Sequence, residues 1–361
     1  MNFTLHLTAD CNLNCRYCYE THTRAHMRET TALRAVDLAF SYGHKSVGFS
    51  LFGGEPLLER GVIESLCRYA AKKGADAGVR VSYKMTSNGT LLDEPFLRFA
   101  EEHGIAIALS HDGLLQDAQR VTRDGRGTMC ALEPVVDLLL KYQPDAIAMQ
   151  TVMPSTVRHM AESVEWLYAR GFSRINTAID YRSDAGWDDA SMAILKEQYE
   201  AIADLSERHF DAKRPLLYLN FLSKIAAYLN DRPCIECKLG MRQPSIAPDG
   251  SIYPCNQFLN LPDYRMGDVE RGIDAQKQRE IYLRSLDPEP ACEGCAIAVR
   301  CRHHCACLNV SLTGHMHEVA PVQCEHERIL IPVADALAAR LYAQKSERFL
   351  RYYREAPEID A

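Results

Sequence analysis

The sequence predicts an α/β fold in which a partial (β/α)6 TIM-like barrel precedes a small loop-rich domain and a C-terminal helix. Up to about residue 180, short β-branched runs alternate six times with segments of helical period. Six β/α units are too few to close an eight-stranded barrel, so we expect an open barrel. The composition changes after residue 231, where eight cysteines fall between Cys234 and Cys307.

The expected strands are short runs rich in β-branched residues, and the expected helices carry apolar residues at helical spacing. The strands cover Phe3–Thr8, Val47–Phe52, Val81–Ser87, Ile105–Ser110, Ile147–Val152 and Arg174–Ile179. The intervening helices cover Thr31–Ser41, Ile63–Lys72, Glu94–Glu102, Cys130–Lys141 and Val157–Arg170. Because parallel barrels place their chemistry at the carboxyl ends of the strands, residues directly after these strands are candidate site residues.

The same patterns divide the chain into four regions. Residues 1–185 are expected to form the partial barrel, and residues 186–231 a linker with bridging helices. Residues 232–325 form the loop-rich cysteine domain, in which metal sites replace a large core. Residues 326–361 return to helical spacing and are expected to pack back on the body as a C-terminal helical segment.

Composition and charge argue against a nucleic-acid-binding, a membrane-spanning or a secreted protein. Of the 361 residues, 47% are hydrophobic, which is enough for a substantial core, and the formal charge of −7 with interspersed signs argues against a nucleic-acid partner. No apolar run is long enough for a membrane span, and Met1 leads straight into a strand pattern without a secretory signal. We therefore expect a cytoplasmic protein, whose fourteen cysteines bind metal rather than form disulfides.

Cys11, Cys15 and Cys18 form a C-x3-C-x2-C loop directly after the first expected strand. Three thiolates hold only three irons of a four-iron cubane, so the fourth iron is left open. Such an iron can bind the amino and carboxylate groups of a methionine-type ligand and pass an electron to its sulfonium. A zinc loop completed by His22 or His26 remains the alternative.

This loop resembles that of the radical S-adenosylmethionine (SAM) superfamily. The superfamily has an aromatic residue before the third cysteine, here Tyr17, whose backbone lies near the adenine. Its glycine-rich strand end, which contacts the methionyl amine, is matched by Gly53-Gly54-Glu55-Pro56 after the second expected strand. Taken alone, this tetrapeptide is also compatible with an ordinary turn.

The resemblance implies further contacts to SAM. It places Ser87 and Asn88 near the ribose, and Ser110 and Asp112 near the nucleoside or the substrate. Arg120 is expected to reach the methionyl carboxylate. Polar residues at strand ends are also common caps and turn formers, so these roles compete with purely structural ones.

In the second cysteine group, Cys237, Gly250 and Cys255 are followed by Cys292-x2-Cys295-x5-Cys301-x3-Cys305 and then by Cys324. This pattern resembles the SPASM extension of radical SAM enzymes that modify peptides and proteins. The family's connectivity implies two auxiliary four-iron clusters, which gives three [4Fe–4S] clusters in all. Paired zinc ribbons are the alternative. Cys307 lies two residues after an implied ligand; we expect a bystander, and an alternative ligand or a thiol near the site are the other interpretations. The first auxiliary cluster would use Cys234, Cys237, Cys255 and Cys305, and the second Cys292, Cys295, Cys301 and Cys324.

We therefore expect a radical SAM oxidoreductase that acts as a maturase of a ribosomal peptide or small protein, by thioether or carbon–carbon cross-linking. Sulfatase maturases resemble the stretch around Cys255 but carry an aspartate where this chain has Asn256, and an amide is no general base. Formylglycine formation of the sulfatase-maturase kind and a small-molecule dehydrogenase are the alternatives. A remote alternative is an electron carrier without catalysis.

The expected partners follow from this chemistry. Reduction of the first cluster requires a low-potential donor of the flavodoxin or ferredoxin type. The first strand begins by about residue 3, which leaves no room for an N-terminal leader-peptide recognition domain. We therefore expect substrate recognition by another surface or by a separate leader-binding protein.

Overall fold

One eleven-stranded sheet runs through the molecule in the order β11-β10-β9-β8-β1-β2-β3-β4-β5-β6-β7. The computed structural model describes residues 1–229, 237–259, 261–286, 290–302 and 305–355. The strands are β1 (Asn2–Thr8), β2 (Ser46–Gly53), β3 (Arg80–Ser87), β4 (Ile105–Ser110), β5 (Ile147–Val152), β6 (Arg174–Ile179), β7 (Leu217–Tyr218), β8 (Ser245–Ile246), β9 (Ser251–Tyr253), β10 (Gly267–Asp268) and β11 (Gly272–Ile273).

Strands β1 to β6 are parallel neighbours in chain order, which confirms the predicted partial α/β barrel. Their side chains alternate between the two faces of the sheet. On β1, for example, Phe3, Leu5 and Leu7 are fully buried on the side of the sheet that the helices cover. The β-branched and aromatic runs seen in the sequence are the strands of this core.

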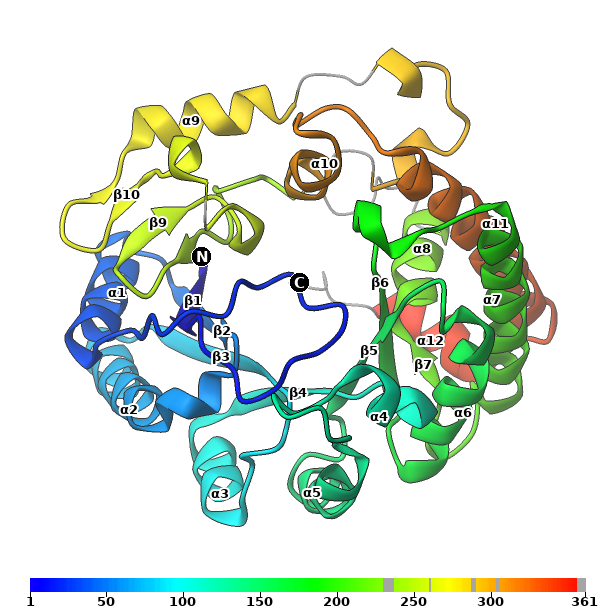
Figure 1. The fold of residues 1–361 in the computed structure, drawn as a ribbon, viewed down its shortest axis with the longest axis horizontal. Coiled ribbons are helices and arrows are strands. Elements are labelled where there is room, and N and C mark those ends of the chain that lie inside the picture. The colour runs from blue at the N-terminus through cyan, green and yellow to red at the C-terminus, as the bar shows by residue number, and fades with distance from the viewer. Residues whose placement is uncertain (230–236, 260, 287–289, 303–304, 356–361) are drawn as a thin grey trace.

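The helices form a ring outside the curved sheet, with α1, α2, α3 and α5 following one another around it (Figure 1). They are α1 (Glu29–Ser41), α2 (Arg60–Ala77), α3 (Glu94–His103), α4 (Gln116–Gln119), α5 (Met129–Tyr142), α6 (Met160–Arg170), α7 (Asp189–His209), α8 (Leu219–Leu229), α9 (Ala275–Arg284), α10 (Ala306–Thr313), α11 (Pro321–Ala343) and α12 (Glu347–Glu355).

Local signals explain why the expected helices begin and end where they do. The Asp93 side chain accepts a hydrogen bond from the N–H of Phe96 and caps α3, and Gly104 ends that helix in the left-handed region. Helix α7 begins at a capping box made by Asp188 and Ser191. Such caps supply partners for the backbone groups that a helix end leaves unpaired.

The sheet continues past the six predicted strands at both edges. Strand β7 adds to β6 in parallel, while β8 pairs with β1 in parallel and leads into the antiparallel strands β9 to β11. The cysteine-rich region is thus joined to the barrel through the backbone of β1. Helix α11 packs against α7 and α8.

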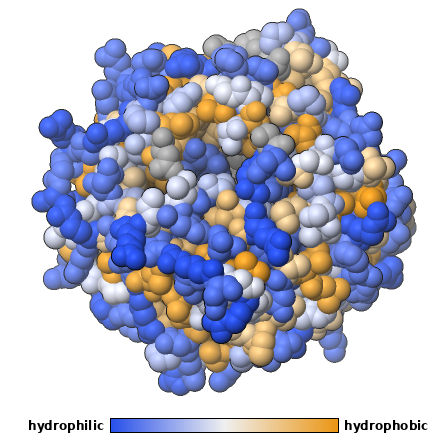
Figure 2. Space-filling model, in the orientation of Figure 1, coloured by the Kyte–Doolittle hydropathy of each residue, from blue (hydrophilic) through white to orange (hydrophobic). Residues whose placement is uncertain are grey.

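A cavity of about 1730 Å³ is lined by inner residues of strands β1 to β6, among them Thr86 and Ala108. Asn256, from the cysteine-rich region, also lines it. Figure 2 shows the face of the molecule seen in Figure 1, where hydrophilic side chains cover most of the periphery. Among the described residues, no helix is long and apolar enough to cross a bilayer.

Candidate active site

The loop that carries the first three predicted cluster cysteines directly follows β1 and crosses the face of the ring in front of the strands (Figure 1). It is held by backbone hydrogen bonds to the segment after α4. The N–H of Asn14 donates to the carbonyl of Val121 over 2.8 Å, and the N–H of Arg16 donates to Gln119 over 2.9 Å. These bonds fix the cysteine loop next to Arg120.

The cysteines of this loop fit an iron–sulfur cluster. A cavity of about 610 Å³ lies beside the loop and is lined by Cys15 and Cys18. The N–H of Leu13 lies 3.4 Å from Sγ of Cys11, and Nδ2 of Asn88 lies 3.7 Å from the same sulfur. N–H donors of this kind stabilise cluster thiolates and tune their potential. A cluster held here would supply one-electron chemistry.

Burial has a clear effect on the free thiols of this loop. Desolvation raises the pKa of Cys11 to about 11 and that of Cys15 to about 12. Both are therefore protonated at neutral pH in the metal-free protein. Metal ligation has to displace these protons, so binding is coupled to their release.

The two histidines of the zinc alternative, His22 and His26, have different partners in the structure. Nε2 of His22 lies 3.5 Å from Sγ of Cys18. Nδ1 of His26 is instead hydrogen-bonded to Oε1 of Glu59 at 2.6 Å and to Oγ1 of Thr8 at 3.1 Å. Within the described ranges, no three His, Cys, Asp or Glu side chains are grouped to hold a single metal ion.

The predicted glycine-rich strand end lies against the cysteine loop. The N–H of Gly54 donates to the carbonyl of Thr8, and the N–H of Glu55 donates to that of Asp10. A Cβ on Gly54 would lie 2.2 Å from the Asp10 carbonyl oxygen, and Gly53 has a φ of +137°. Only glycine lets the two backbones approach so closely at this point. The tetrapeptide therefore positions the first cysteine of the loop.

The carboxylate of Glu55 is fully buried and is bound by the protein itself. It accepts hydrogen bonds from the Ser87 hydroxyl at 2.8 Å, from the Asn88 N–H at 2.7 Å and from the Leu57 N–H at 3.0 Å. Burial raises the pKa of Glu55 to about 7, although these donors oppose the shift. Three predicted SAM contacts thus form one buried cluster that links the ends of β2 and β3.

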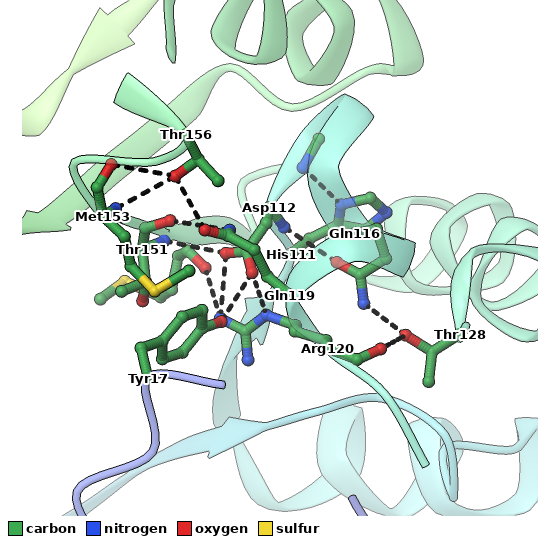
Figure 3. Close-up of polar contacts among 12 residues, drawn as sticks. Tyr17, His111, Asp112, Gln116, Gln119, Arg120, Thr128, Thr151, Met153 and Thr156 are labelled. Carbon is green, nitrogen blue, oxygen red and sulfur yellow. Dashed lines mark hydrogen bonds and ion pairs between the residues drawn. The ribbon is translucent and has the colours of Figure 1, made fainter. Parts of the chain in front are cut away.

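A second buried network joins Tyr17, Asp112 and Arg120 (Figure 3). The Tyr17 hydroxyl donates to Oδ2 of Asp112 at 2.6 Å, and Nε of Arg120 donates to the same oxygen at 3.0 Å. Oδ1 accepts from the Thr151 N–H at 2.8 Å. Ser110 ends β4 just before this network and is half-buried. One carboxylate therefore ties the cysteine loop to the ends of β4 and β5.

The described cysteines implied for the first auxiliary cluster lie together. Cys237 is close enough to Cys255 and Cys305 for their charges to interact. Cys307 joins this group, because its Sγ lies 3.5 Å from that of Cys305. The contact with Cys307 lowers the pKa of the buried Cys305 thiol below its ordinary value. Cys234 lies outside the described residues.

The cysteines implied for the second auxiliary cluster come from two neighbouring segments. Two of them share a turn, a third follows a short 3-10 helix, and the fourth lies in the first turn of α11. The side chain of Gln323, at the start of α11, donates to the Arg302 carbonyl and so joins the segments. In chain order these cysteines are Cys292, Cys295, Cys301 and Cys324.

Sequence reasoning singled out Asn256 but missed Tyr19 and Glu20, which lie near it or near the first cysteine loop. Nδ2 of Asn256 lies 3.5 Å from the Tyr19 hydroxyl, and its Oδ1 lies 3.0 Å from Sγ of Cys255. Glu20 lines the cavity beside the first loop, where its Oε1 lies 3.8 Å from Nδ1 of His6. The position of Tyr19 and Glu20 directly after a predicted cluster ligand was the signal that could have found them.

Residues 5–167 match the model of the radical SAM superfamily. This stretch of the chain is a radical SAM domain, which confirms the resemblance carried by the cysteine loop and the glycine-rich strand end. It also confirms that the protein is an enzyme rather than a pure electron carrier.

Relatives and solved structures extend this similarity over most of the chain. The chain is 26% identical to a serine-type anaerobic sulfatase-maturating enzyme of Klebsiella aerogenes, covering 82% of this chain and 76% of that one. It is 22% identical to a cysteine-type anaerobic sulfatase-maturating enzyme of Clostridium novyi, covering 82% and 85%.

The fold is shared with two solved structures. The structure of anSMEcpe with bound AdoMet and a peptide aligns with a TM-score of 0.81 at 19% identity, covering 98% of this chain and 99% of that one. SuiB of Streptococcus suis bound to its precursor peptide SuiA aligns with a TM-score of 0.61 at 16% identity, covering 89% and 75%.

Proposed function

We propose that this enzyme oxidises one residue of a peptide or small protein by removing a hydrogen atom and then a second electron. The proposal rests on the position of Asn256, which lines the cavity of about 1730 Å³ and contacts Cys255. A cysteine implied as an auxiliary-cluster ligand thus lies at the wall of the cavity. An electron leaving a substrate there has a short path to that cluster.

The cofactors proposed are three [4Fe–4S] clusters and SAM. Cys11, Cys15 and Cys18 would hold the first cluster, and SAM bound beside it would supply radical chemistry able to remove a hydrogen atom from the substrate. The residues of the chain orient the reaction: the strand-end glycines hold the cysteine loop, and the Asp112 network fixes Arg120 at the site. Cys234 completes the proposed ligand set of the first auxiliary cluster.

The peptide substrate is supported by the cavity and by the comparisons. A cavity of about 1730 Å³ exceeds the volume of an ordinary small-molecule pocket. Both solved structures with the same fold were determined with peptides, and the similar enzymes mature a protein. We propose a cytoplasmic enzyme with a low-potential electron donor and a separate leader-binding protein.

Two oxidation products are supported by different observations. Similarity to sulfatase-maturating enzymes favours conversion of a serine or cysteine to an aldehyde. The amide of Asn256, which is no general base, favours a cross-link such as a thioether. Glu20 lines the neighbouring cavity, so a carboxylate is nevertheless present near the first loop.

Product analysis tests this proposal. The reduced enzyme is incubated with SAM and with peptides from short reading frames beside its gene or with a sulfatase-derived peptide. We expect one peptide to lose two hydrogens, or to exchange a thiol for an aldehyde oxygen. Resistance of one cysteine to alkylation identifies a thioether, and capture by a hydrazine identifies an aldehyde. Turnover of a small metabolite with no peptide modified would contradict the proposal.

A further inference from the structure

Cys307 is a buried thiol for which the proposed clusters leave no role. It lies in the first turn of α10, two residues after Cys305, and is 9% exposed. Its Sγ is 3.5 Å from Sγ of Cys305. This thiol thus contacts a cysteine implied as a ligand of the first auxiliary cluster.

The short sulfur–sulfur distance indicates how Cys307 acts. Thiolates that ligate different irons of a cubane carry negative charge and have the cluster between them. A direct sulfur–sulfur hydrogen bond needs one sulfur to keep its proton as the donor. The contact between Cys305 and Cys307 therefore fits one ligand thiolate and one protonated thiol better than two ligands.

We propose that Cys307 is a positioning residue whose S–H donates a hydrogen bond to the Cys305 thiolate and thereby raises the reduction potential of the first auxiliary cluster. Hydrogen bonds to cluster sulfurs are among the determinants of such potentials, because they stabilise the more negative reduced state. This inference rests on the auxiliary cluster proposed above. The higher reduction potential makes that cluster a better acceptor for the electron that the substrate loses.

The test is a redox titration of the intact, reconstituted enzyme followed by electron paramagnetic resonance, with iron counted in each sample. Cys307→Ala should keep the iron content of the unaltered enzyme, about twelve for three four-iron clusters. At a fixed potential, the ratio of reduced to oxidised cluster should fall about tenfold for one auxiliary cluster, as expected for the loss of one hydrogen bond to a charged acceptor. Cys307→Ser retains a donor and should restore most of that ratio.

Cys67→Ala is the matched control, because Cys67 is a fully buried cysteine on α2, far along the chain from the auxiliary ligands. It should leave the titration unchanged. Loss of about four irons from either Cys307 variant would make Cys307 a ligand and overturn the proposal. An unchanged titration of Cys307→Ala would also overturn it.

Two further outcomes are distinguishable. If Cys307→Ala does not fold, Cys307→Val, which is close to cysteine in volume and has no donor, takes its place: full iron with a lowered reduced fraction supports the hydrogen bond, and an unchanged titration or lost iron refutes it. An unaltered enzyme with only about four irons would refute the proposed auxiliary clusters themselves, and this inference with them.

Discussion

Asp112 shows at the scale of one residue how the site is held in place. Its carboxylate is fully buried and accepts hydrogen bonds from the Tyr17 hydroxyl, from Arg120 and from the Thr151 N–H. The guanidinium of Arg120 also lies over the Tyr17 ring, 5.2 Å from its centre. A buried charge pair of this kind depends on both partners, because either one alone would be an uncompensated charge.

We predict that Asp112→Asn lowers the free energy of unfolding by about 3 to 5 kcal/mol, because it leaves the buried Arg120 guanidinium without its counter-charge. The measurement is chemical denaturation under anaerobic conditions. The same variant should bind SAM more weakly, since Arg120 and Tyr17 lose their common anchor.

Asp124→Asn is the matched control, because Asp124 pairs with Arg126 at an exposed position. It should change stability little, since solvent-exposed ion pairs contribute little. Equal effects of the two substitutions would show that the Asp112 network does not hold the site together.

At the scale of elements, the end of β2 and the cysteine loop after β1 depend on each other. Gly54 is where they touch, and a side chain there would meet the Asp10 carbonyl. We predict that Gly54→Ala displaces the loop and lowers both the stability and the iron retained at the first cluster. Thermal unfolding and iron analysis of the anaerobic protein measure these effects.

Gly61 offers the control for this prediction. A Cβ on Gly61 has no neighbour within 4 Å, and the residue lies in α2. Gly61→Ala should therefore raise stability by about 0.5 to 1 kcal/mol through helix propensity and leave the iron content unchanged. Full iron retention in Gly54→Ala would contradict the role given to the strand end.

The elements also show what the sequence could predict. The six barrel strands were found within one or two residues, because each is a buried run between turn residues, and Ile105–Ser110 matches β4 at both ends. Strands β8 to β11 were missed, since runs of two or three residues carry no measurable period. Their pairing is set by the neighbouring strand, which local sequence does not reveal.

Part of the candidate site could also be predicted from the sequence. Motif spacing identified the cysteine loop and the residues at strand ends, because their positions relative to strands carry the signal. It did not show that the Glu55 carboxylate is bound by Ser87 and Asn88, which come from another strand end. It also gave no sign that Cys307 contacts Cys305, because that contact depends on the turn into α10.

At the scale of the whole molecule, the barrel and the cysteine-rich region form one continuous sheet. Strand β8 pairs with β1, the strand that precedes the first cysteine loop. The contacts of Asn256 with Tyr19 and with Cys255 bridge the two cysteine groups above that sheet. The proposed clusters are thus carried on a shared framework, which suits electron transfer between the substrate cavity and the auxiliary clusters.

The most direct test of radical SAM chemistry is the release of 5′-deoxyadenosine from SAM by the reduced, anaerobically reconstituted enzyme, measured together with iron. We expect about twelve irons and nucleoside release in the unaltered enzyme. With Cys11, Cys15 and Cys18 replaced by alanine, we expect about eight irons and no release, because the auxiliary clusters keep their own ligands. Zinc in place of iron, or no nucleoside from the unaltered enzyme, would contradict radical SAM chemistry in this protein.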